Sequence, residues 1–79
     1  MLIRVLFFGA AADAAATRAT TVEVVDGAVL CDLISTLREN FPQLADLTLR
    51  SALNETHSNG SEPLTNGDEV AIFTPVSGG

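Results

Sequence analysis

Apolar residues follow a strand-like pattern at both ends of the chain and a helical pattern in the middle. Residues 2–8 are short, β-branched, aromatic and almost continuously apolar, which predicts a central strand buried on most of both faces. Residues 20–25 alternate between apolar and polar and end at the turn signal Asp26-Gly27. They therefore predict a second strand that pairs with the first. Between them, alanine-rich residues 10–19 predict a loop with at most one helical turn.

Residues 29–40 predict the one long helix. Its apolar positions recur at a helical spacing and form a single stripe: Leu30, Leu33, Ile34, Leu37 and Phe41. Arg38 falls on the solvated side of this helix, and Pro42 ends it, because the residue before a proline disfavours helical angles. Asp26 is the nearest residue suited to capping its start, since Ala28 is a poor cap.

The second half of the chain predicts shorter elements. Leucines 44, 47 and 49 fit no single element type. Residues 51–54 read as a short strand, and residues 55–61 as a polar loop with a turn at Asn59-Gly60. A second tight turn at residues 66–68 leads into a final strand over residues 69–74.

This order of elements predicts an α+β fold. An open sheet with its single long helix on one face buries both the helix stripe and the inward strand faces. The first and last strands are the most apolar, so we place them side by side and parallel at the centre of a mixed sheet of about five strands. That arrangement is a β-grasp, the ubiquitin-like fold, over residues 1–74, followed by a flexible tail over residues 75–79.

Composition narrows the possible functions. A chain of 79 residues has room for one core, and with four phenylalanines as its only aromatic residues it is unsuited to a deep pocket for a large cofactor. The net charge of −6 disfavours nucleic acid and anionic membranes as partners. All four basic residues are arginines, so no lysine side chain can accept an isopeptide bond.

Two residues with reactive side chains, Cys31 and His57, are expected to have no catalytic or metal-binding role. Cys31 is the only cysteine, which excludes an internal disulfide, and it is expected to pack at the border of the helix stripe. His57 is expected to be a solvated loop side chain without a metal, because no ligands stand at a suitable spacing. Without a signal segment or a long apolar run, the expected location is the cytoplasm.

The chain ends on Ser77-Gly78-Gly79, directly after an apolar strand. Two glycines without Cβ atoms can pass through a channel too narrow for side chains, and they present a free carboxylate. A partner enzyme could activate that carboxylate with ATP as an acyl-adenylate. The alternative is an ordinary frayed end, which is also often rich in small residues.

The sequence resembles a known family at several points together. These are Ile3 to Gly9, the helix end Phe41-Pro42, and above all residues 63–79, in which Leu-Thr-Asn-Gly-Asp-Glu-Val is followed by an apolar strand, Pro75 and the terminal Gly-Gly. In these features the chain resembles the small subunit of molybdopterin synthase, the MoaD-like branch of the MoaD/ThiS superfamily of ubiquitin-like sulfur carriers. It departs from this pattern at Thr74, where many relatives have the first proline of a pair.

The resemblance implies a sulfur-carrier mechanism for molybdenum cofactor biosynthesis. A MoeB-like adenylyltransferase would use ATP to adenylate the Gly79 carboxylate, and a persulfide sulfur donor would convert it to a thiocarboxylate, a covalent 1-thioglycine. The tail would then enter a MoaE-like large subunit and donate sulfur to cyclic pyranopterin monophosphate. The family forms a heterotetramer of two small and two large subunits. This chain would be the non-catalytic subunit, with no stably bound cofactor and with the catalytic residues on the large subunit.

The partner-binding residues are expected at the end of the last strand. Phe73, Pro75 and Val76 are candidate apolar anchors, while Ser77 and Gly78 are small enough to enter a narrow channel. Alternation along the strand places either Ile72 or Phe73 in the core and leaves the other exposed. Three other functions stay open: a ThiS-like thiamin sulfur carrier, a ubiquitin-like protein modifier, and a β-grasp interaction domain with an inert tail.

Overall fold

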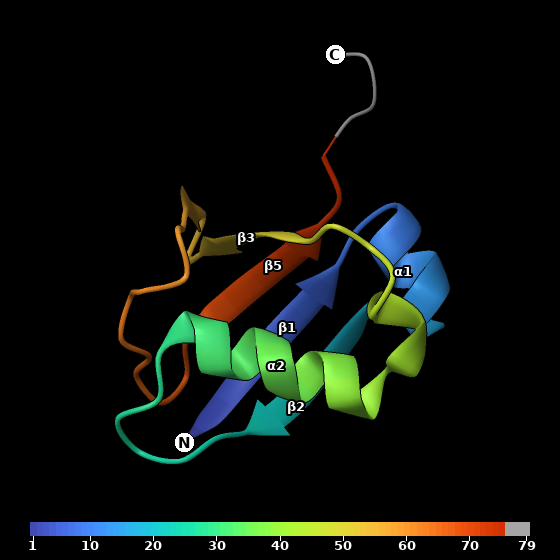
Figure 1. Ribbon diagram of the computed structural model, residues 1–79. Coiled ribbons are helices and arrows are strands. Elements are labelled where there is room, and N and C mark those ends of the chain that lie inside the picture. The colour runs from blue at the N-terminus through green and yellow to red at the C-terminus, as the bar shows by residue number, and fades with distance from the viewer. Residues whose placement is uncertain (76–79) are drawn as a thin grey trace.

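The computed structural model describes residues 1–75 and shows a five-stranded mixed sheet with one long helix across one face (Figure 1). The strands are β1 (Leu2–Phe7), β2 (Ala19–Glu23), β3 (Arg50–Leu53), β4 (Thr56–His57) and β5 (Glu69–Phe73), and the helices are α1 (Ala10–Ala15), α2 (Leu30–Asn40) and the 3₁₀ turn η1 (Pro42–Leu44). Residues 76–79 lie outside the described part, and with them most of the predicted tail over residues 75–79.

The sheet has the predicted topology. Its strand order is β2-β1-β5-β3-β4, with β1 and β5 parallel at the centre and β1 antiparallel to β2. The fold is therefore the predicted β-grasp. The order follows from apolar content, because the most apolar strands gain most from central positions, where they are covered along both edges.

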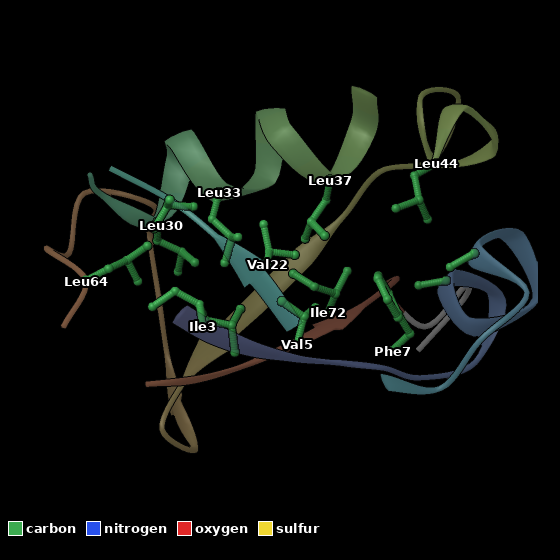
Figure 2. Close-up of a cluster of buried hydrophobic side chains, with 14 of the residues drawn as sticks. Ile3, Val5, Phe7, Val22, Leu30, Leu33, Leu37, Leu44, Leu64 and Ile72 are labelled. Atoms are coloured by element: carbon green, nitrogen blue, oxygen red, sulfur yellow. The ribbon is translucent and has the colours of Figure 1, made fainter. Parts of the chain in front are cut away.

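The core fills the space between α2 and one face of the sheet (Figure 2). Leu30, Leu33 and Leu37 of α2 are fully buried and face Val5 and Ile72 of the central strands. The prediction that β1 is buried on most of both faces is wrong, because its side chains alternate and Leu2 is 52% exposed. A single long helix covers a single face, so the second face of the sheet stays open to solvent.

Capping interactions at both ends of α2 differ from the predicted ones. At the start, Val29 is the N-cap residue and its N–H donates to the Asp32 carboxylate at 2.9 Å, so Asp32 and not Asp26 stabilises this end. Near the other end, half-buried Arg38 donates to the carbonyl oxygens of Leu44, Ala45 and Leu47 at 2.9–3.2 Å. Arg38 is therefore not a solvated side chain, and it orders the leucine segment whose structure the sequence pattern did not predict.

Two short elements appear where loops were expected. Residues 10–15 form α1, longer than the single turn predicted, with Ala11 and Ala15 buried against the core. Within the supposed polar loop of residues 55–61, Thr56 and His57 form β4 and pair with β3. The hairpin turns at Asn54 and Glu55, which have φ values of 48° and 72°. Two consecutive positive φ values characterise the tight turn that matches strand twist.

Glu55 is strained in this turn, which gives a stability prediction. A non-glycine residue at positive φ is disfavoured because its Cβ approaches the backbone. We expect Glu55→Gly to raise the free energy of unfolding by about 1 kcal/mol, measured by urea denaturation. The matched control is Thr56→Gly on the adjacent strand residue, which should lower it by a similar amount. Equal destabilisation by both substitutions would contradict the assigned strain.

Candidate functional site

The end of β5 is held firmly at the centre of the sheet. On one side β5 pairs with β1, and the Phe8 N–H donates to the Ile72 carbonyl oxygen at 2.9 Å. On the other side it pairs antiparallel with β3, with Arg50 opposite Phe73. The chain therefore leaves a rigid platform at Thr74 and exposed Pro75, which lead toward Gly78 and Gly79. Of the predicted site residues, Val76, Ser77, Gly78 and Gly79 lie outside the described part.

Alternation along β5 gives Ile72 and Phe73 opposite roles. Ile72 is fully buried and faces the core, whereas Phe73 is half-buried on the open face of the sheet. Phe8, at the end of β1 beside it, is 51% exposed. With Leu6 and Ala71, which are half-buried on the same face, these rings form an apolar surface at the root of the tail. We call Leu6, Phe8, Ala71 and Phe73 the open-face patch.

Two polar residues lie beside this patch that sequence reasoning did not place there. The His57 ring meets the Phe73 ring edge-on, with centroids 5.8 Å apart and planes at 78°. His57 is exposed, as expected for a solvated side chain, but it belongs to β4 and contacts Phe73, so its predicted placement in a loop is wrong. Arg50 was missed because its position opposite Phe73 depends on strand register. Successive residues of a strand point to opposite faces, so Arg50 lies on the open face because the next residue, Ser51, is buried.

A shallow hollow lies on the other side of Phe8. Its lining comes from the end of β1, from α1 and from the start of β2, and it is mainly apolar, with Asp13 and Arg18 as its charged members. It is continuous with the open-face patch through Leu6 and Phe8. The apolar surface at the root of the tail therefore extends from Phe73 across Phe8 to the start of β2.

Other chemistry-bearing residues do not join this site. Cys31 lies in the first turn of α2 and is exposed, so the expectation that it packs is wrong. It lines a second hollow with Ser51 of β3 and Ser58 of the following loop, and its backbone N–H donates to the Gly60 carbonyl oxygen at 2.9 Å. Among residues 1–75, no three His, Cys, Asp or Glu side chains are gathered as a metal would require. No helix in this part is long and apolar enough to cross a membrane.

Comparison with known proteins agrees with this geometry. Residues 5–79 match the ThiS family. The chain belongs to the ThiS family. Curated relatives named molybdopterin synthase sulfur carrier subunit match its full length; the one from Chlamydomonas reinhardtii is 37% identical over 83 residues, covering 100% of both chains.

Solved structures place this ThiS-family chain among β-grasp proteins. SAMP1 from Haloferax volcanii superposes with a TM-score of 0.90 at 26% identity, covering 100% of both chains. A protein complex of subunits 1 and 2 of the molybdopterin-converting factor from Helicobacter pylori contains a chain with a TM-score of 0.72 at 28% identity, again covering 100% of both chains. These likenesses confirm the predicted fold and the predicted family resemblance.

Proposed function

We propose that this chain is the sulfur carrier of molybdopterin synthesis and delivers sulfur from a thiocarboxylate at Gly79. The observation that carries this proposal is the full-length match to curated sulfur carrier subunits. The geometry supports it. The central strand β5 ends at Phe73, shortly before the Gly-Gly end in the sequence, and the open-face patch provides a docking surface beside the end of that strand.

The chemistry proceeds in three steps at one carbon atom. The Gly79 carboxylate attacks the α-phosphorus of ATP on a MoeB-like partner, which forms an acyl-adenylate and releases pyrophosphate. The terminal sulfur of a persulfide donor then attacks the acyl carbon and displaces AMP. A thiol reduces the resulting acyl disulfide, which leaves the thiocarboxylate and an oxidised disulfide on the donor. The carrier supplies none of the catalytic groups, and it holds no cofactor of its own beyond this covalent 1-thioglycine.

The partner that consumes the sulfur is a large synthase subunit. A solved complex of subunits 1 and 2 of a molybdopterin-converting factor includes a relative of this chain, which supports such a partner here. We propose a heterotetramer of two small and two large subunits, acting in the cytoplasm on cyclic pyranopterin monophosphate. Each carrier brings one sulfur, so the two sulfurs of the product need two deliveries. Phe73, Pro75 and Val76 would contact the large subunit as apolar anchors, while Ser77 and Gly78 enter its channel.

Intact mass spectrometry tests the proposal against its alternatives. The purified chain is incubated with ATP, the cognate adenylyltransferase and a persulfide donor, and then with the large subunit and cyclic pyranopterin monophosphate. The expected result is a gain of ~16 Da, as one oxygen is replaced by sulfur, which is lost again as molybdopterin forms. Larger adducts linked to lysines would indicate a protein modifier. Sulfur transfer to a thiazole precursor instead would indicate a thiamin carrier, and an unchanged mass would refute all three functions.

A further inference from the structure

Charged side chains are divided unevenly between the two ends of the sheet. Acidic residues gather at the end remote from the tail, where β2 ends at Glu23, β5 begins at Glu69 and the Asn54 side chain donates to Asp68 at 3.1 Å. Arg4 lies at that end on the open face, 3.6 Å from the Glu69 carboxylate. At the end of the sheet remote from the tail, the charge of Arg4 is therefore offset by the Glu69 carboxylate.

Arg50 has no such partner within the part of the chain that the structure describes. The ion pairs among residues 1–75 are Met1 with Asp26 and Arg4 with Glu69. Arg50 is exposed at the tail end of β3, on the open face directly opposite Phe73. The chain has a net charge of −6, yet none of its described carboxylates forms an ion pair with Arg50. The Arg50 guanidinium is therefore available to a carboxylate on a partner protein.

His57 adds a second polar group on the same flank. It pairs with Ala52 one strand beyond β3, and its ring packs edge-on against Phe73. That contact involves the carbon edge or face of the ring and no hydrogen bond, and none of the side-chain hydrogen bonds found among residues 1–75 involves the imidazole of this exposed residue. Phe73 is thus bordered on its β3–β4 side by two side chains that can donate to carboxylates.

We propose that Arg50 and His57 determine partner specificity by donating to carboxylates on the large synthase subunit, around an apolar seat for Phe73. This inference rests on the proposed function. An apolar patch alone binds any complementary apolar surface, whereas a desolvated arginine penalises partners that present no acid to it. The partner that binds here is therefore the large subunit. It covers the β3–β4 side of the open-face patch, next to the start of the tail, and presents carboxylates to Arg50 and His57.

The experiment measures the affinity of the full-length chain for the cognate large subunit at low and high salt. We expect Arg50→Gln to weaken binding about 10-fold at low salt and to flatten its salt dependence. The matched control is Arg4→Gln, which removes the same charge from the same face at the remote end and should change affinity by less than about twofold. His57→Leu keeps an apolar contact with Phe73 but loses the donor, and should weaken binding about threefold.

The outcomes separate this inference from the function on which it rests. If wild-type chain fails to bind the large subunit, the proposed function is wrong. If wild-type binding is normal but Arg50→Gln behaves like Arg4→Gln, or if His57→Leu binds as tightly as wild type or more tightly, the specificity proposal is overturned. Loss of adenylation with unchanged large-subunit affinity would assign the acidic surface to the adenylyltransferase, which also overturns it. Circular dichroism confirms that each variant is folded.

Discussion

Deleting Gly79, or adding one alanine after it, is expected to abolish thiocarboxylate formation. Either change moves the terminal carboxylate by about 3.3 Å along an extended chain. Reactions that depend on positioning lose about 100-fold for a misplacement of only 1 Å, so we expect a loss of at least 100-fold in each variant. The measurement is the rate at which the ~16 Da sulfur adduct appears in intact mass spectra, where the replacement of oxygen by sulfur is read directly.

The control for these variants is stability. The buried core found among residues 1–75 extends from Ile3 to Ile72, and terminal residues usually contribute little to a core, so the urea midpoint should match that of wild type. Affinity for the large subunit should fall far less than the rate of sulfur loading, because the open-face patch is intact. A chain extended by one residue that still accepts sulfur at the wild-type rate would contradict the assignment of Gly79 as the reacting group.

Alanine substitutions at the neighbouring residues Ile72 and Phe73 are expected to affect different properties: the first lowers stability and the second weakens partner binding. Ile72 is fully buried between the sheet and α2, so Ile72→Ala should lower the free energy of unfolding by about 2–5 kcal/mol. A domain of this size has a total stability of only about 4–12 kcal/mol, so much of this variant could be unfolded. Ile72→Val is the milder substitution and should cost about 0.5–1.5 kcal/mol, measured by urea denaturation.

Phe73→Ala should instead impair partner binding. Its ring is half-buried on the open face and contacts His57, so its removal should cost about 1 kcal/mol of stability or less. An aromatic anchor at the centre of an interface commonly contributes 2 kcal/mol or more, so large-subunit affinity should fall by at least about 30-fold. A large loss of stability with unchanged affinity in Phe73→Ala would contradict the assignment of its side chain to the docking surface.

Local patterns were enough to predict the main elements. The apolar stripe of α2 has a period that only a helix can place on one side, and Leu30, Leu33 and Leu37 are all fully buried. The apolar strands at the two ends predicted β1 and β5 as central parallel neighbours, which the strand order confirms. Short elements were harder to predict. α1 and β4 depend on contacts with η1, β3 and the core more than on their own propensity.

For the site, the sequence by itself determined the Gly-Gly end and the candidate anchors Phe73 and Pro75, because these depend on residue identity alone. It did not determine which side of the sheet Phe73 occupies or that Arg50 and His57 lie beside it. Those facts follow from register across β5, β3 and β4 and from α2 covering a single face. Alternation along a strand assigns its side chains to two faces, but it does not show which face is buried. Only the packing of the helix decides which face becomes the core and which stays open for a partner.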